Sequence, residues 1–504
     1  MTGLLALLIA TPAQAGEFLD VWVTTAFEDT NINAGPGDYS PSANFVMRGN
    51  RTFFENYEAR YSDDISQSHL VLYRHDDGFA EGWSTEAAMV IQFSPFLNPD
   101  QTSDGVDISD DGSYVRVIRD LPGDDHSLSL TGYAIDASRF RLGYSYDLSY
   151  GGKEIMARPV WAMPGARLQW QREGTYAFLG AKSAINAMIY PTTELDVTGE
   201  DNDSWEGTRN QAYYSFLSGA GMQLGNMLFE VGAGLFQQGQ LENVPDQSSV
   251  LYGRMISAYG LSGQVGWRNS EEIDFIQSGE LKLYRNTPEY MRETYISHRS
   301  HDGFGMLVQA EANLLGHDLL DADDDNATTI ETALAGDIQT VFLINNTEVN
   351  VDFVYKDLPY ILFNIPGLTS GVSLPEDMVT TPQLYWRAKV SHYLPELNFA
   401  PSIGVGLMQP ASYTTSDGTY VQYSERDKEG VPADRGEATN ILAAVAGGQL
   451  DISNSMVAVG EVLYTVDNNL SKVEAGPDGN LIRVSESAAV RNALGFNLML
   501  RARF

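Results

Sequence analysis

The feature that most constrains the fold is an alternation of apolar and polar residues with a period of two, which recurs along most of the chain. In TEVNVDFVYK, residues 347–356, Val351 and Phe353 alternate with Asn350 and Asp352. Successive side chains of a β-strand point to opposite faces, so each such segment has one apolar and one polar face. The pattern predicts an all-β fold.

The length of these segments indicates where the strands lie. Residues 83–93 and 304–314 repeat the alternation over about ten residues, which is the length that a tilted strand needs to cross a bilayer. After residue 15 no apolar run approaches the ~18 residues of a membrane-spanning helix. Helices and closed barrels are the structures that satisfy every backbone group in a membrane. We therefore predict a single large antiparallel transmembrane β-barrel; the same alternation also fits a soluble all-β protein.

The last segment, GFNLMLRARF at residues 495–504, keeps the alternation to the final residue. Chain ends usually fray unless they are docked, so this strand is expected to be held by its neighbours. Its apolar face, which we expect to contact lipid, consists of Leu494, Phe496, Leu498, Leu500, Ala502 and Phe504.

The first residues predict export. GLLALLIATPAQA has a short apolar core and small residues at Ala13 and Ala15, which predicts a signal peptide over residues 1–15 and a barrel over residues 16–504. Within the barrel, residues 29–65 fit either an inward-folded loop or extra strands. No second domain is evident.

Barrel strands are joined alternately by tight turns and long loops. Counting the strands back from Phe504 gives about 20, within a range of roughly 18–22, for an even-numbered barrel. The tight turns are expected at residues 136–139, 172–174, 224–226, 268–272, 344–346, 394–396 and 452–454.

Composition excludes several classes of function. The chain has 67 acidic and 31 basic residues, a net charge of -36, and no cluster of Lys and Arg that could bind nucleic acid. It has no cysteine, which excludes disulfides and Cys-based zinc sites. The seven His residues form no motif with Ser and an acid. We expect neither an enzyme nor a cofactor.

The polar faces of the predicted strands carry both signs of charge. A water-filled lumen tolerates such side chains and a lipid face does not. Alternatively, they pair into a network that stiffens the wall. The residues expected to face the lumen are Arg139, Arg141, Asp147, Arg167, Glu230, Glu348, Asp352, Arg387, Lys389, Glu461 and Arg501.

Three stretches, residues 100–112, 196–206 and 318–331, are rich in acids and contain no Lys or Arg. At a pore mouth they would concentrate cations, which predicts a preference for cations. The alternative is a solvated acidic surface, where salt at ~0.15 M screens charges beyond roughly 8 Å.

One acidic stretch is similar to a calcium loop. In DADDDNATTIE, Asp321, Asp323 and Asp325 occupy the first, third and fifth ligand positions of an EF-hand loop. Asn326 replaces the glycine, and Glu331 stands at position eleven instead of twelve. These departures favour loosely bound Ca²⁺ and bridging to the outer leaflet over an EF-hand site.

The export signal, the alternating aromatic strands and Phe504 resemble the porin-like outer-membrane β-barrels of Gram-negative bacteria. The stretch SRFRLGYSYDLSYGG, residues 138–152, is also similar to large porin-like barrels. The resemblance implies that Phe504, Leu500 and Leu498 form an insertion signal read by the barrel-assembly machinery. It also implies an outer-membrane location, with lipid and lipopolysaccharide as partners.

Two functions fit the sequence. The first is a channel for passive diffusion of ions and small hydrophilic solutes, because a barrel of this size encloses an aqueous lumen unless something plugs it. The second is a loop-plugged barrel that serves as an anchor or docking subunit for a protein partner. A homo-oligomer fits both.

Overall fold

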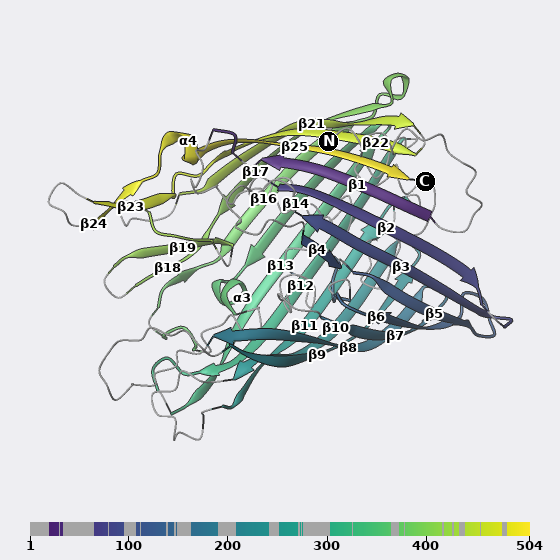
Figure 1. The fold of residues 1–504 in the computed structure, drawn as a ribbon, viewed down its shortest axis with the longest axis horizontal. Helices are drawn as coiled ribbons and strands as arrows, with labels where there is room; N and C mark the ends of the chain where they lie inside the picture. The colour runs from purple at the N-terminus through teal and green to yellow at the C-terminus, as the bar shows by residue number, and fades with distance from the viewer. Residues whose placement is uncertain are drawn as a thin grey trace.

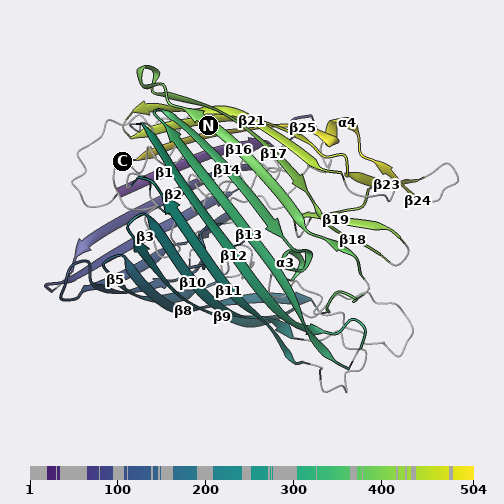
Figure 2. The same ribbon diagram turned by 180° about the vertical axis from the view of Figure 1, so that it is seen from behind.

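Strands that follow one another along the chain pair into an antiparallel ring (Figures 1 and 2). The computed structural model describes residues 20–29, 31–33, 65–78, 80–94, 107–110, 112–137, 140–145, 148, 163–189, 208–240, 251, 253–270, 273, 275, 303–324, 326–363, 372–376, 378–415, 418–425, 428–432, 439–453, 455–475 and 481–503.

The ring strands are β1 (Asp20–Asp29), β2 (Ile65–Asp77), β3 (Trp83–Ser94), β5 (Tyr114–Asp120), β6 (Ser127–Tyr133), β7 (Gly165–Arg172), β8 (Thr175–Ile189), β9 (Thr208–Leu224), β10 (Met227–Gln240), β11 (Met255–Arg268), β12 (Phe304–Leu320), β13 (Thr328–Ile344), β14 (Thr347–Lys356), β16 (Gln383–His392), β17 (Phe399–Gln409), β21 (Ile441–Ser453), β22 (Met456–Val466) and β25 (Asn492–Arg503). A shorter strand, β4 (Asp107–Asp110), extends the pairing of β3.

The ring closes because the last strand pairs with the first, with Arg501 opposite Thr24 and Met499 opposite Ala26. In the described part of the chain the closed barrel has 18 strands. The predicted all-β barrel is thus confirmed, and 18 falls inside the predicted range, slightly below the expected 20.

The last strand, β25, lies between β1 and β22. Leu498 is 52% exposed on the outer face, and Leu500 lies on the same face, partly exposed. The expected docking of the strand is present. Phe504 lies outside the described residues.

The two faces of the wall differ in chemistry. On β10 and β11, Val231 and Leu261 point outward and are 66% and 59% exposed. Their polar neighbours Glu230 and Gln264 point inward and are buried. Burial of apolar area away from water drives folding, so an outer face of exposed Val and Leu requires an apolar surrounding such as lipid.

The two ends of the barrel also differ. Tight turns at residues 173–174, 225–226 and 345–346 close hairpins at one end, called the turn end below. The other end, called the loop end, carries the smaller elements (left side of Figure 1). These are a sheet of β15 (Thr380–Thr381), β18 (Ala411–Thr414), β19 (Tyr420–Glu425) and β20 (Lys428–Gly430), the hairpin β23 (Ser471–Ala475) and β24 (Leu481–Ser485), and the helices α3 (Leu358–Leu362) and α4 (Ala488–Arg491). A short 3-10 helix, η3 (Pro395–Leu397), occupies the β16–β17 turn.

The helices in the described part of the chain are short. None of them combines the length and the apolar character that a membrane-crossing helix needs.

The tight turn predicted at residues 268–272 is wrong. β11 pairs directly with β12, with Arg268 opposite Leu307, so the connection between them covers residues 269–303. Ile273 and Phe275 are buried against inner side chains of β10, β12 and β13. The Arg268 guanidinium donates to the carbonyl of Ile273 at 2.5 Å. These contacts hold Ile273 and Phe275 inside the barrel at the turn end.

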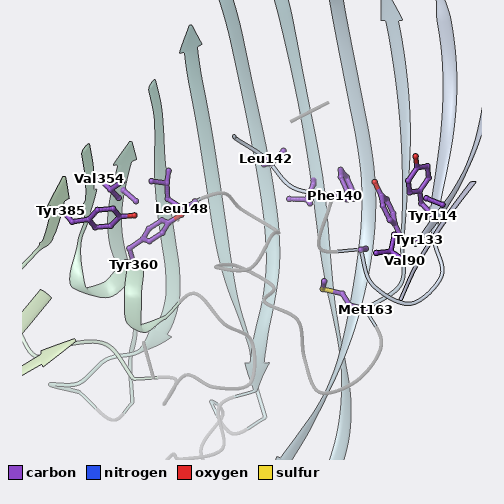
Figure 3. Close-up of a cluster of buried hydrophobic side chains, with 14 of the residues drawn as sticks. Val90, Tyr114, Tyr133, Phe140, Leu142, Leu148, Met163, Val354, Tyr360 and Tyr385 are labelled. Atoms are coloured by element: carbon purple, nitrogen blue, oxygen red, sulfur yellow. Dashed lines mark hydrogen bonds between the residues drawn. The ribbon is translucent and has the colours of Figure 1, made fainter. Parts of the chain in front are cut away.

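The strand predicted from RFRLGYSYDLSY and the turn at residues 136–139 are also wrong. The described residues from 134 to 148, called the inward segment below, leave the wall after β6, and those from Asp136 onward are buried inside the barrel. Figure 3 shows Phe140, Leu142 and Leu148 there. Every described side chain from residue 140 to 145 is buried, and Gly143 has a φ of 91°, which does not fit a strand. The apolar and polar residues do alternate, but side chains of both kinds are buried inside the barrel.

Of the predicted loop or strands at residues 29–65, Asp29 ends β1 and Ile65 begins β2. Residues 34–64 lie outside the described residues, as does the signal peptide predicted for residues 1–15.

Candidate functional site

The inward segment packs on a part of the wall where glycines replace inner side chains. A Cβ atom added to Gly180 of β8 would lie 2.6 Å from Phe140 Cε1, and one added to Gly232 of β10 would lie 3.0 Å from Leu142 Cδ2. Both distances are too short for undisturbed packing. The glycines therefore make the space that Phe140 and Leu142 fill.

Polar contacts fix the backbone of the inward segment to β12. The N–H groups of Tyr144 and Ser145 donate to Glu311 Oε2 at 2.6 and 2.8 Å. A Cβ atom on Gly143 would lie 1.9 Å from Glu311 Oε1, so the close approach requires glycine as well as the positive φ. Asn313 Nδ2 completes the anchor, donating to Glu311 Oε1 at 2.8 Å and to the Leu148 carbonyl at 2.6 Å.

Tyr144 adds a side-chain contact to the anchor. Its hydroxyl donates to the Gln309 carbonyl at 2.9 Å. Burial raises the pKa of the Tyr144 phenol well above its usual value, and the charge of Asp337 raises that pKa further. The phenol therefore stays protonated and remains a donor.

At the loop end, α3 covers the far end of the inward segment. The Tyr360 hydroxyl donates to the Leu148 carbonyl, and Gln238 of β10 donates to the Phe363 carbonyl just after the helix. Figure 3 shows Leu148 beside Tyr360, with Leu142 between this pair and Phe140. The segment thus runs along the wall from β8 to β12 and ends beneath α3.

Basic residues surround Phe140 at the other end of the segment. The Arg167 guanidinium lies 4.3 Å from the centroid of the Phe178 ring, which contacts Phe140 edge-on at a centroid distance of 6.1 Å. Lys182 Nζ donates to the Ala137 carbonyl at 3.0 Å. Cation–π contacts of this kind stabilise desolvated bases, so these bases help to hold the segment.

A charged stretch begins on β14 and continues over β16. Arg387 Nε donates to Asp352 Oδ2 at 2.7 Å, and both side chains are 4% exposed. On the same face of β16, Lys389 Nζ donates to Glu461 Oε1 of β22 at 3.0 Å. Glu461 is 3% exposed but Lys389 is 23% exposed. The lysine is therefore the member of this pair that meets solvent.

Lys389 and Glu461, called the charge bridge below, meet across the two strands that separate β16 from β22. Lys389 stands opposite Gly404 of β17, and Glu461 stands opposite Gly447 of β21. A Cβ atom on Gly447 would lie 2.7 Å from Glu461 Cγ. Asn497 Nδ2 supports the far side, 3.4 Å from Glu461 Oε2. Glycine thus lets two long charged side chains lie along the wall.

The structure places the residues that the sequence assigned to the lumen as follows. Arg141 is buried but belongs to the inward segment, so its predicted place on a wall strand is wrong. Arg139 and Asp147 lie outside the described residues. The inner face of the wall carries Arg167, Glu230, Glu348, Asp352, Arg387, Lys389, Glu461 and Arg501.

Sequence reasoning missed the anchoring role of Glu311 and the glycines under Phe140 and Leu142. Alternate glycines at Gly232 and Gly234 of β10, and at Gly219 and Gly221 of β9, are a signal that was present in the sequence. Glycine inside a strand often marks a close approach by other groups. What approaches them could not be read from the pattern.

The candidate calcium residues lie at the loop end. Asp321 Oδ1 accepts from the N–H of Asp323 at 2.9 Å, and Asp323 Oδ2 accepts from the N–H of Glu376 at 3.2 Å. Asp325 lies outside the described residues, as do residues 196–206. Within the described ranges, no three His, Cys, Asp or Glu side chains are grouped to hold a metal ion. Calcium binding stays a prediction.

No family model and no curated protein matches the sequence. Among solved structures, it is similar to the outer membrane protein OpdK of Pseudomonas aeruginosa, at 7% identity over 96% of this chain and 98% of that chain, with a TM-score of 0.43. OccAB2 of Acinetobacter baumannii is 6% identical over 96% of this chain and 97% of that chain, with a TM-score of 0.46. OprD of P. aeruginosa is 8% identical over 96% of this chain and 93% of that chain, with a TM-score of 0.43. At such values the likeness says nothing about function, which has to follow from the barrel itself.

Proposed function

We propose that the chain is a porin-like channel through which ions and small hydrophilic solutes diffuse passively. The observation that carries the proposal is the inverted chemistry of the wall, which is apolar outside and charged inside. Leu179 and Ile403 are exposed on the outer face, whereas Asp352, Arg387 and Glu461 face inward. A barrel of 16 to 18 strands is wide enough to leave an aqueous lumen unless a plug fills it.

The outer face supports a membrane location. Its exposed Leu, Val, Ile and Phe side chains form the kind of apolar belt that lipid-facing barrel strands carry. We place the protein in the outer membrane of a Gram-negative bacterium, surrounded by lipid and lipopolysaccharide and inserted by the barrel-assembly machinery. No catalytic role is proposed.

The inward segment gives such a channel a constriction. It occupies space along β8, β10 and β12, where Gly180, Gly232 and Glu311 hold it. The charge bridge lies elsewhere on the wall, with Lys389 in contact with solvent. A lumen narrowed on one side and charged on another would limit solutes by size and by charge.

Selectivity for cations would come from the loop end. The inner wall carries acids and bases alike, so it gives no clear excess of one sign. At the loop end, Asp321, Asp323 and Asp324 form an acidic surface. Such a surface raises the local concentration of cations by field focusing, an effect that salt weakens.

Single-channel recording of the refolded protein in a planar bilayer under a KCl gradient tests both the channel and its preference for cations. Stable steps with a cation-selective reversal potential are the expected result. Steps without selectivity would remove the role of the loop-end acids and keep the channel. Barrels that are verifiably folded, by a heat-dependent shift in gel mobility, and that never conduct would overturn the channel.

The second candidate is a plugged barrel that anchors or docks a protein partner, as a monomer or a homo-oligomer. The observation that favours it is the filling of both ends. Ile273 and Phe275 lie inside the turn end, and the inward segment with α3 lies toward the loop end. Folded but silent barrels that elute at a defined oligomeric mass, or with a bound protein, would support this candidate.

Divalent binding at Asp321 and Asp323 is a separate proposal. Their carboxylates already accept backbone hydrogen bonds, so loose binding and bridging to lipopolysaccharide fit them better than a closed site. Calorimetric titration with Ca²⁺ should give a weak signal that the D321N/D323N variant lacks. A wild-type titration without heat, and without a thermal shift, would discard the site.

A further inference from the structure

We infer that solutes cross the barrel off its axis, along the wall of β16, β17, β21 and β22, and that the charge bridge of Lys389 and Glu461 sets charge selectivity there. This inference rests on the proposed channel function. It adds a route and two selectivity-determining residues, and it differs from a pore lined evenly by the whole ring.

The first argument is the position of the inward segment. It contacts the wall at β7, β8, β10 and β12, through Arg167, Gly180, Gly232 and Glu311. In the ring, eight strands separate β10 from β25 on either side, and β22, which carries Glu461, pairs with β25. Around β10, the segment therefore narrows the lumen from a part of the wall that lies across the ring from β22, the strand of Glu461.

The second argument is the size of the inner side chains on β17, the strand that pairs with β16 beside Lys389. Three successive inner positions of β17 hold Ser402, Gly404 and Gly406, whose side chains have at most one heavy atom beyond Cβ. On β21, Gly447 lies opposite Glu461 and the larger Val445 lies opposite Gly404. On β8 and β10, by contrast, Phe140 and Leu142 fill the space above the glycines. The small inner residues of β17, together with Gly447 of β21, leave room for Lys389 and Glu461 to meet across β17 and β21.

The third argument is the unequal exposure of the charge bridge. Lys389 is 23% exposed and Glu461 is 3% exposed, with Asn497 behind the carboxylate. An ion that passes along this wall would come closest to the ammonium group of Lys389, and the carboxylate of Glu461 behind it would also act on the ion electrostatically. Neutralising the lysine should favour cations, and neutralising the glutamate should favour anions, because each change leaves the partner charge in place.

The natural chain has no cysteine, so a single introduced thiol is a clean probe. Ser402 of β17 and Ser262 of β11 form a matched pair. Both are inner-face serines on wall strands and both are 8% exposed. Ser402 lies opposite Gly447, beside the charge bridge, and Ser262 lies opposite Gly232 and Asn313, beneath the inward segment.

In the experiment, S402C and S262C are refolded, and each is treated in lipid with a cationic and then with an anionic methanethiosulfonate reagent. Current is recorded in a planar bilayer, and labelling is measured by mass spectrometry. The S402C current should fall, with reversal potentials that shift in opposite directions for the two reagents. S262C should label at least about ten-fold more slowly and keep its current, because the inward segment covers it.

The charge variants complete the test. K389Q should raise the cation-to-anion permeability ratio by roughly two- to five-fold, and E461Q should lower it by a similar factor. R74Q is the control, because it removes a charge from an ion pair on the outer face near the turn end. It should leave the cation-to-anion permeability ratio unchanged. Each variant is checked for folding by its gel mobility before recording.

The outcomes separate the route from the channel. If wild type conducts but the reagents block S262C, or block both cysteine variants equally, the off-axis route is wrong and the channel stands. If K389Q and E461Q leave the permeability ratio unchanged, the charge bridge does not set selectivity. If folded wild type never conducts, the channel and the route both fall, whatever the labelling rates.

Discussion

Two parts of the inner wall both contain glycines that leave space for another group, but the group is apolar in one part and charged in the other. On β8 and β10, Gly180 and Gly232 make space for the apolar Phe140 and Leu142 of the inward segment. On β21, Gly447 makes space for Glu461, which meets Lys389. Glycine on a strand opens room without deciding what enters it. The occupant is decided by the neighbours, which are Phe178 on the first wall and Asn497 on the second.

The largest effect is expected from the charged part of the wall. Asp352→Ala leaves Arg387 buried without its carboxylate, and breaking a buried ion pair costs about 3–5 kcal/mol. The measurement is the free energy of unfolding by urea in lipid vesicles. The double variant Asp352→Leu, Arg387→Met should cost much less, since neither charge remains. A loss below about 1 kcal/mol for the single variant would mean that water replaces the pair.

The second effect concerns the wall that holds the inward segment. Glu311→Ala removes the acceptor of the Tyr144 and Ser145 N–H groups, and hydrogen bonds to a charged group contribute about 1.5–3 kcal/mol. We expect a loss of stability near that range and a larger unit conductance, because the segment is released into the lumen. Glu311→Gln keeps one acceptor oxygen, so its stability and its unit conductance should lie between those of the wild type and Glu311→Ala. Unchanged conductance in a folded Glu311→Ala barrel would show that the segment does not narrow the path.

The third effect tests the space under the segment directly. Gly232→Ala places a methyl group 3.0 Å from Leu142 Cδ2, and overpacking of this kind costs about 1–3 kcal/mol. Gly263→Ala on β11 is the matched control, since nothing lies within 4 Å of its added Cβ. The control should be neutral or slightly stabilising. Equal unfolding free energies for the two variants would refute the packing role of Gly232.

The smallest change in the free energy of unfolding is expected in the β23–β24 hairpin, which lies outside both parts of the inner wall. Lys472 and Glu474 of the β23–β24 hairpin form an ion pair at 2.8 Å, but their side chains are 44% and 50% exposed. Exposed pairs contribute little, so Lys472→Ala should change the free energy of unfolding by less than about 0.5 kcal/mol. A loss comparable to that of Gly232→Ala would mean that charge at the loop end matters more to stability than inner packing does.

The alternation of side chains was readable because strand geometry imposes it locally. It placed Glu348 and Asp352 on the inner face of β14 and Phe353 on the outer face. The tight turns at residues 224–226 and 344–346 were readable for the same reason, since a hairpin reverses within a few residues.

The inward segment was misread because alternation does not say what covers each face. A strand between lipid and lumen shows the same alternation as a segment that is buried against the glycine-lined inner wall. The deciding contact joins Ser145 to Glu311, which are separated by 166 positions in the sequence. The same limit applied to Arg268 and Phe275, where local turn residues suggested a hairpin and burial inside the barrel prevailed.

The sequence by itself determined that the chain forms alternating strands and which residues share a face, because both follow from the two-residue period of an extended backbone. Only the tertiary structure decided that 18 strands close through β25 and β1, that the described residues of the inward segment from Asp136 onward lie inside the ring, and that Lys389 reaches Glu461. These contacts join residues far apart in the chain, and their geometry exists only once the ring has closed.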